Sequence, residues 1–261
     1  MTFAGKVVAI TGAAGGIGQA LCRYFGEQGA VIAALDRNAA VEAFVRDLAA
    51  ARIKAVAETV DIADADAVAK SFASISARLG VIAILVNNAG FSDHPTFART
   101  DPAGWRKDVS GNLDGAYHCA YAVLPGMTAN GGGSIVNVGS VNGLAALGDP
   151  AYSAAKAGMI SLTRSLAVEY GRFGVRANIV LPGTVRTPLW ERRAKKDPTV
   201  LAKLTRWYPL GRIVEPLDVA RAVGFLASDA ASAITGAALP VDCGLTAGNI
   251  VMARELTLED F

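Results

Sequence analysis

The fold is decided by the stretch Thr11-Gly12-Ala13-Ala14-Gly15-Gly16-Ile17-Gly18. An apolar run, Lys6–Thr11, leads into this stretch, and a helical pattern over Ile17–Gln28 follows it at once. Glycines at such a junction allow a tight turn and let backbone N–H groups approach a pyrophosphate at the N-terminus of the helix. The glycine spacing is a variant of the dinucleotide-binding fingerprint, and its position between a strand and a helix strengthens that interpretation.

Beyond this stretch, short aliphatic runs alternate with longer amphipathic patterns. The runs predict strands at Lys6–Thr11, Ala30–Asp36, Ile53–Val60, Ile82–Asn87, Ser134–Val138, Arg176–Val180 and Ala238–Val241. The amphipathic patterns predict helices at Ile17–Gln28, Ala40–Ala50, Ala63–Leu79, Gly104–Ala129, Tyr152–Arg172 and Pro216–Ala227. This alternation indicates an α/β protein with a single-domain Rossmann fold, in which helices cover both faces of a doubly wound parallel sheet of about seven strands.

The chain shows no repeat, linker or composition shift that would mark a second domain. Residues 1–261 are therefore predicted to form a single dinucleotide-binding and catalytic domain. The segment from Thr184 to Arg212 stands apart, because Pro188, Pro198 and Pro209 interrupt it. It is predicted to be an irregular insertion over the carboxyl edge of the sheet.

Composition and charge exclude several classes of function. The net charge of +2 over 261 residues is too small to indicate a nucleic-acid or membrane partner. Cys22, Cys119 and Cys243 are widely spaced and odd in number, which predicts neither a disulfide framework nor a metal site. The start of the chain lacks a secretion-signal pattern, and no apolar run reaches membrane-spanning length. We expect a cytoplasmic protein that acts on a small molecule.

Asp36 ends the second predicted strand, eighteen residues after Gly18. A carboxylate at this position accepts hydrogen bonds from the adenosine ribose hydroxyls and repels a 2′-phosphate, so it predicts NAD as the cofactor, with NADP less favoured. A turn or a helix N-cap is the alternative role for Asp36. Arg37 could partly offset the repulsion, but the glycine loop itself contains no basic residue.

Two further polar positions follow predicted strands. Asp61 comes after the third strand, and Asn88-Ala89-Gly90 comes after the fourth. Both lie at strand carboxyl ends, where open α/β sheets bind their ligands. Asp61 could hold the adenine amino group and Asn88 could brace the central strands, with simple turn formation as the alternative for each.

Tyr152 and Lys156 lie four residues apart in a helical pattern, which puts a phenol and an ammonium on one face of the helix. An unperturbed tyrosine, with a pKa of about 10, is a poor base at neutral pH. A cation beside it favours the phenolate and moves its pKa toward the working range. The pair alone is weak, because helix surfaces produce this spacing by chance.

Taken together, the motifs make nearly the whole chain, from Lys6 to about Gly248, resemble a short-chain dehydrogenase/reductase. They are TGAAGGIG, NNAG, Ser140 twelve residues before Tyr152, YSAAK, and Pro182-Gly183. The resemblance implies that Tyr152 is the general acid/base and that Lys156 lowers its pKa and binds the nicotinamide ribose. It further implies that Ser140 orients the substrate oxygen and that Asn112 holds a water linked to Lys156. An irregularity in the helix is the alternative role for Asn112.

The cofactor-binding residues implied by the glycine motif, the strand ends and the resemblance are Gly12, Gly16, Ile17, Gly18, Asp36, Arg37, Asp61, Ile62, Asn88, Ala89, Gly90, Tyr152, Lys156, Pro182, Gly183, Thr184, Val185 and Thr187. The resemblance places Thr184 and Thr187 against the nicotinamide carboxamide. The predicted substrate residues are Ser140, His94, Asn142, Tyr152, Arg186, Trp190 and Arg193. No metal is expected, and the resemblance implies a homotetramer.

The segment from Thr184 to Arg212 contains eight basic and two acidic residues, a net charge of +6. In the family this segment is a lid over the substrate. One interpretation is a solvated helix face; the sharper hypothesis is that Arg186, Arg192 or Arg193 attracts an anionic group of the substrate. Trp190, Trp207 and Tyr208 could form an apolar wall of the pocket or pack the lid down. His94 could contact the substrate or lie in a surface loop.

These observations predict an NAD-dependent alcohol dehydrogenase or ketoreductase. The hydride would move between nicotinamide and a secondary alcohol or ketone of a polar small molecule such as a sugar, polyol or hydroxy acid. A reductase of 3-oxoacyl groups on a carrier protein is one alternative, but Asp36 weighs against it because such enzymes generally favour NADP. A non-catalytic dinucleotide-binding regulator is a remoter alternative, because Ser140, Tyr152 and Lys156 are all present.

Overall fold

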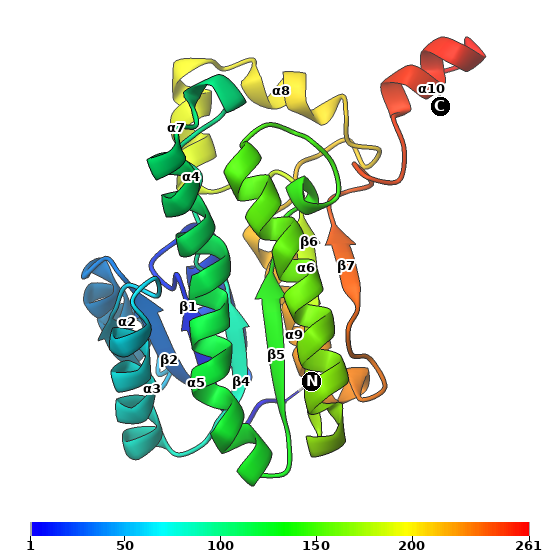
Figure 1. The fold of residues 1–261 in the computed structure, drawn as a ribbon. Coiled ribbons are helices and arrows are strands. Elements are labelled where there is room, and N and C mark those ends of the chain that lie inside the picture. Colours follow the sequence, from blue (N-terminus) through cyan, green and yellow to red (C-terminus); the bar gives the residue numbers. More distant parts are fainter. Residues whose placement is uncertain (1, 261) are drawn as a thin grey trace.

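A seven-stranded parallel sheet forms the centre of the molecule in this computed structural model, which describes residues 2–260, with the backbone only at Leu189 (Figure 1). The strands are β1 (Val7–Thr11), β2 (Val31–Asp36), β3 (Ala55–Thr59), β4 (Ile82–Asn87), β5 (Gly133–Val138), β6 (Val175–Pro182) and β7 (Ala238–Val241). Their order in the sheet is β3-β2-β1-β4-β5-β6-β7. The predicted strands and the Rossmann fold class are confirmed. The order reverses between β1 and β4, which is the topological switch point where such sheets bind ligands.

Helices cover both faces of this sheet. They are α1 (Gly16–Glu27), α2 (Ala40–Ala50), α3 (Ala65–Leu79), α4 (Pro102–Val109), α5 (Gly115–Ala129), α6 (Pro150–Tyr170), α7 (Pro188–Lys196), α8 (Val200–Thr205), α9 (Pro216–Ala227) and α10 (Ile250–Thr257). One core lies between the sheet and α1, α2 and α9, and a second lies between the sheet and α3, α5 and α6. Helix α10 projects away from the rest of the chain (Figure 1).

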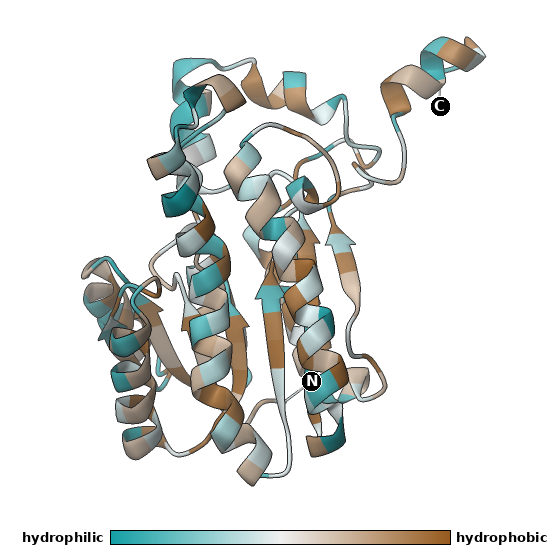
Figure 2. Ribbon diagram, in the orientation of Figure 1, coloured by the Kyte–Doolittle hydropathy of each residue, from teal (hydrophilic) through white to brown (hydrophobic). Residues whose placement is uncertain are grey.

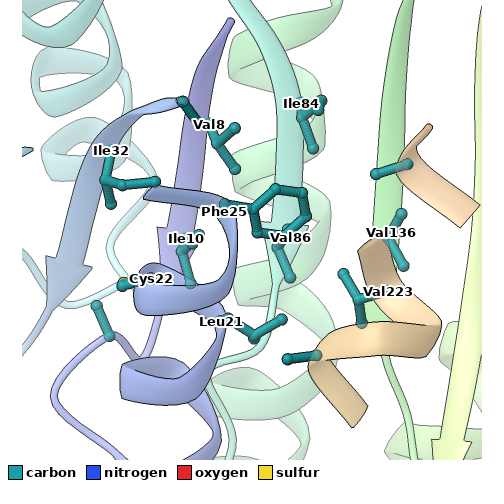
Figure 3. Close-up of a cluster of buried hydrophobic side chains, with 14 of the residues drawn as sticks. Val8, Ile10, Leu21, Cys22, Phe25, Ile32, Ile84, Val86, Val136 and Val223 are labelled. Atoms are coloured by element: carbon teal, nitrogen blue, oxygen red, sulfur yellow. The ribbon is translucent and has the colours of Figure 1, made fainter. Parts of the chain in front are cut away.

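Strand β1 shows why its apolar run is unbroken. Val8 and Ile10 point into the first core, where Leu21 and Phe25 of α1 cover them (Figure 3). Val7 and Ala9 point into the second core. A strand buried on both faces needs apolar side chains at every position. The hydropathy colours agree, because the central strands are mostly brown while the helices carry teal on their outer surfaces (Figure 2).

Two regions differ from the sequence prediction. The single helix predicted over Gly104–Ala129 is α4, a π-helical turn at Ser110–Asp114, and α5. The segment from Thr184 to Arg212 was predicted to be irregular, but it contains α7 and α8. The prolines do not prevent these helices, because Pro188 occupies the first turn of α7, where a missing N–H costs no hydrogen bond.

Across residues 2–260, the helices are all too short or too polar to cross a bilayer. In the same part of the chain, no three His, Cys, Asp or Glu side chains are grouped as metal ligands would be.

Candidate active site

Two neighbouring cavities open at the carboxyl edge of the sheet. One, of about 600 Å³, lies along the glycine loop and reaches Asp36 and Asp61. The other, of about 850 Å³, contains Ser140, Tyr152 and Lys156. Ile17, Asn88, Gly90 and Phe91 line both cavities, so one ligand could extend from the first into the second.

The glycine loop is packed so closely that side chains do not fit. A Cβ on Gly12, where φ is +66°, would lie 2.8 Å from Ala89 Cα, and a Cβ on Gly18 would overlap the carbonyl oxygen of Gly12. No side chain caps the N-terminus of α1, and its first turn contains no acidic residue. The open N–H groups of this helix end can therefore accept an anion.

Asp36 braces this loop as well as facing the cavity. Its Oδ2 accepts a hydrogen bond of 2.9 Å from the backbone N–H of Ala14, and its Oδ1 accepts one of 2.9 Å from that of Asn38. The alternative role in a turn is thus present, and the ionised oxygens keep further acceptor capacity. Arg37 also lines the cavity, with its guanidinium carbon 4.7 Å from the centre of the Phe91 ring.

Asn88 joins the two central strands, as predicted. Its Nδ2 donates to the carbonyl oxygens of Thr11 and Gly12, at 2.9 and 3.1 Å. Its backbone N–H and that of Ala89 both donate to the Thr11 hydroxyl, each at 3.0 Å. These bonds fix the loop after β4 against the glycine loop. Asp61 and Ile62 line the same cavity beyond this junction.

Tyr152 and Lys156 occupy the first two turns of α6, where the helical spacing places their side chains together. The Lys156 ammonium lies 5.5 Å from the centre of the Tyr152 ring. Ser140, at the end of β5, hydrogen-bonds the Tyr152 side chain and accepts a bond of 3.2 Å from the backbone N–H of Asn142. The three predicted catalytic side chains therefore meet in one cavity.

The electrostatics of this trio differ from the prediction in one respect. Burial raises the pKa of Tyr152, the hydrogen bond from Ser140 acts to lower it, and the charge of Asp149 raises it further. Lys156 is not among the causes of this shift, and its ammonium donates to the carbonyl oxygen of Val138, at 3.0 Å. Burial also lowers the pKa of Lys156 itself, to about 8. The site thus combines a protonated Tyr152 phenol with a Lys156 ammonium whose pKa is lower than that of an exposed lysine.

Asn112 lies inside a π-helical turn, so the irregularity in the helix is present, while its role in holding a water linked to Lys156 stays a prediction. Its Nδ2 donates to the carbonyl oxygens of Phe91 and Asp108, each at 2.8 Å. Gly90 separates the two side chains: a Cβ there would lie 2.7 Å from Asn112 Oδ1 and 3.1 Å from Lys156 Nζ. The π turn therefore positions an amide against the ammonium.

The segment after β6 lies across both cavities. Pro182, Gly183, Thr184 and Val185 line the larger cavity, and Thr187 lines the smaller one. Helices α7 and α8 then cross the carboxyl edge, at the top of Figure 1. Pro188 begins α7 against the glycine loop, where a Cβ on Gly16 would lie 2.9 Å from its Cδ atom.

On the substrate side, the structure gathers most but not all of the predicted residues. Those lining the larger cavity are Ser140, Asn142, Tyr152, Trp190 and Arg193. The described lining does not include His94, because its Nδ1 is held 3.1 Å from Asp108 Oδ2. Nor does it include Arg186, whose Nε pairs with Glu215 Oε1 at 2.8 Å.

Phe91 and Asp149 are among the cavity residues that were not predicted as site residues, and Arg192 was considered only for the substrate side. Phe91 follows the NNAG motif directly and lines both cavities. Asp149 lines the larger cavity and precedes Pro150, a pair typical of a helix start. Arg192 lines the smaller cavity beside Thr187 and Pro188. Phe91 could have been found from its position after the NNAG motif, and Asp149 from its position before the proline that begins a helix. The direction in which Arg192 points depends on α7, which the sequence analysis did not predict.

Comparisons with known proteins agree with this geometry. A family profile described as enoyl-(acyl carrier protein) reductase matches residues 12–246. Cis-4-hydroxycyclohexanecarboxylate dehydrogenase of Sinomonas cyclohexanicum is 40% identical over 247 residues, which cover 94% of this chain and 98% of that protein. Meso-2,3-butanediol dehydrogenase of Serratia marcescens is 37% identical over 254 residues, covering 95% and 98%. A solved oxidoreductase of the short-chain dehydrogenase/reductase family from Burkholderia thailandensis is 53% identical, with a TM-score of 0.92 and 98% of each chain covered.

Proposed function

Because this chain belongs to the short-chain dehydrogenase/reductase family and is an oxidoreductase of alcohol or ketone groups, we propose that it transfers a hydride between NAD and a secondary alcohol or ketone of a small molecule. The observation that carries the proposal is the meeting of Ser140, Tyr152 and Lys156 in a cavity that adjoins the glycine loop. The named substrates of the relatives include a hydroxy acid and a diol, which is consistent with a small polar substrate.

The residues of the smaller cavity fit a dinucleotide. The uncapped N-terminus of α1 offers N–H groups to the pyrophosphate, and Arg192 adds a cation to the lining of the same cavity. Asp36 and Asp61 lie where adenosine hydroxyl and amino groups would need acceptors. Gly12, Gly16, Ile17 and Gly18 would form the floor, and the segments 88–90 and 182–187 would hold the nicotinamide half. Bound there, NAD supplies the carbon that accepts or returns the hydride.

NAD is favoured over NADP by the charge of Asp36. The carboxylate lines the cavity and would repel a 2′-phosphate. Arg37, the nearest candidate partner for such a phosphate, is stacked on Phe91. Titration of the purified protein with NADH and NADPH, followed by nicotinamide fluorescence, tests this preference. Tighter binding of NADPH would reverse it.

Tyr152 is proposed to exchange a proton with the substrate oxygen. Its raised pKa keeps the phenol protonated at neutral pH, which suits proton donation during ketone reduction. Alcohol oxidation requires the phenolate, so its rate should rise with pH. Ser140 would hydrogen-bond the same substrate oxygen, because a hydroxyl both donates and accepts. Lys156 would donate to the ribose, and Asn112 would keep that ammonium connected to solvent.

The test is a panel of ketones and alcohols, from sugars and hydroxy acids to acyl thioesters, assayed with NADH or NAD and repeated with Tyr152→Phe. The variant keeps the ring and removes only the hydroxyl. We expect kcat to fall at least about 100-fold, since general acid/base catalysis typically contributes that much. A variant with wild-type kcat would refute the assigned role. A preference for acyl thioesters would favour the carrier-protein alternative.

Residues 184–212 are proposed to act as a lid, since α7 lines both cavities and α8 lines the larger one. The proposal also includes a homotetramer. Tyr117 and Tyr121 of α5 and Val168 of α6 are exposed large hydrophobic side chains, as a subunit contact would require. Light scattering after gel filtration measures the assembly, and a monomeric mass would contradict it.

A further inference from the structure

The three arginines at the start of the lid lie in three different environments. Arg186 is neutralised by Glu215, with Nε and Oε1 2.8 Å apart. Arg192 lines the smaller cavity, and Arg193 lines the larger one. Adjacent residues of a helix face directions about 100° apart, which is how neighbours on α7 reach separate cavities. Of the three arginines, Arg193 alone lines the cavity that contains Tyr152.

The Arg193 side chain is held in place, and its positive charge remains available to a ligand. Its guanidinium carbon lies 4.6 Å from the centre of the Trp190 ring, a stacking arrangement that restricts the side chain without neutralising it. No carboxylate within residues 2–260 forms an ion pair with Arg193. The other cation of this cavity, Lys156, is only 2% exposed and donates to Val138. An anion entering the cavity would therefore meet Arg193.

Asp149 adds a negative charge to the lining of this cavity near Tyr152. It precedes α6, three residues before Tyr152, and its Oδ1 accepts a hydrogen bond of 2.6 Å from the Ser92 hydroxyl. Its charge acts on the Tyr152 phenol. A carboxylate on the carbon next to the reacting carbon would lie near Tyr152 and be repelled by Asp149, whereas a more distant carboxylate would be repelled less.

Much of the remaining lining of the larger cavity is apolar. Trp207 and Tyr208 line them, together with Leu147, Leu204 and Leu245. Such side chains match a hydrocarbon body better than the hydroxyl groups of a sugar, which would lose hydrogen bonds to water there.

We propose that the substrate is a monoanionic hydroxy or oxo acid whose carboxylate is separated from the carbinol carbon by an apolar body, with Arg193 as the carboxylate-binding residue. This inference rests on the proposed function, and it narrows the substrate class. A single guanidinium suits a carboxylate, which it can bind through two parallel N–H···O bonds. Asp149 sets the direction of the substrate, because it disfavours the reversed orientation in which the carboxylate lies beside Tyr152.

The experiment compares 4-oxocyclohexanecarboxylate with its neutral amide in the NADH-dependent reaction. The two compounds share shape and carbonyl position and differ in charge. We expect Arg193→Gln to raise KM for the acid about 10- to 100-fold, the loss expected for a charged hydrogen-bonded pair, and to leave KM for the amide within about twofold. Arg193→Lys should recover part of the loss. Lys195→Gln removes a charge from the same helix outside both cavities and should leave the acid-to-amide ratio unchanged.

Cyclohexanecarboxylate, which cannot react, gives a second readout as a competitive inhibitor. Its inhibition constant should rise in Arg193→Gln by the same factor as KM for the acid. The inference is overturned if Arg193→Gln changes neither constant, or if a 2-oxo acid is preferred to the 4-oxo acid. In those cases turnover that depends on Tyr152 would still support the proposed function. An absence of NADH-dependent turnover with every ketone would instead reject the proposed function, and this inference with it.

Discussion

Lys156 is buried at a cost to the stability of the folded protein, and replacing it by methionine should reveal that cost. The side chain is only 2% exposed, and burial lowers its pKa from 10.5 to about 8. Between those two values the unfolded chain binds a proton that the folded chain does not. The free energy of unfolding therefore rises with pH across this window, and below pH 8 the full cost of the buried charge is present.

The magnitude follows from the pKa shift. At about 1.4 kcal/mol per pKa unit, the buried charge costs about 3 kcal/mol at pH 7. Methionine has a similar length and no charge, but it removes the hydrogen bond from Nζ to the carbonyl oxygen of Val138, which is worth about 1 kcal/mol. Lys156→Met should therefore be more stable than the wild type by about 2 kcal/mol at pH 7. In a chain of this size that corresponds to a rise in Tm of about 5 °C.

Thermal unfolding of the cofactor-free proteins, followed by circular dichroism from pH 6 to pH 10.5, measures the difference. The Tm gap should be constant below pH 8 and should close as the pH approaches 10.5. Lys70→Met, at an exposed position of α3, is the matched control and should show no such pH-dependent gap. The reasoning is refuted if Lys156→Met is less stable than the wild type at pH 7, or if its Tm gap does not change with pH.

Three further substitutions probe the cofactor preference, the positioning of the ammonium and the packing of the sheet. Asp36→Ala should raise kcat/KM for NADPH relative to NADH about tenfold, and an unchanged ratio in steady-state kinetics would show that the carboxylate does not set the preference. Gly90→Ala places a Cβ 2.7 Å from Asn112 Oδ1 and 3.1 Å from Lys156 Nζ, so kcat should fall about tenfold or more, and an unchanged kcat would show that Gly90 does not position the ammonium. Arg176→Met removes a guanidinium that donates to three backbone carbonyls, and urea denaturation should show a loss of about 2–4 kcal/mol; a loss below about 1 kcal/mol would contradict this.

The fold could be predicted because its main signals are local. The first four residues of β1 are all apolar, since both faces of the strand are buried. The glycines of the loop between β1 and α1 indicate a tight turn, because a Cβ does not fit at Gly12 or Gly18. Such signals depend on residues near one another in the sequence, and the bounds of the strands followed from them to within about two residues.

The remaining features depend on contacts that no local pattern reports. The π-helical turn is stabilised by bonds from Asn112 to Phe91 and Asp108, and one partner lies twenty-one residues away. The ion pair that neutralises Arg186 uses Glu215, which lies twenty-nine residues later in the sequence. The raised pKa of Tyr152 arises from burial by many elements together. Charge and spacing in the sequence identify candidate site residues, whereas ion-pair partners and burial in the structure determine which of these residues line the cavities.

The lid contacts the glycine loop, and this contact connects the two cavities of the site. Pro188 begins α7 directly against Gly16, so the direction of the helix is set where the pyrophosphate would bind. Four and five residues later the same helix carries Arg192 toward one cavity and Arg193 toward the other. Because both arginines lie on one short helix, a ligand that orders α7 by binding Arg192 would also restrict the backbone that carries Arg193. We therefore expect NADH to lower the Kd of an anionic substrate analogue, and equal Kd values with and without NADH would contradict this coupling.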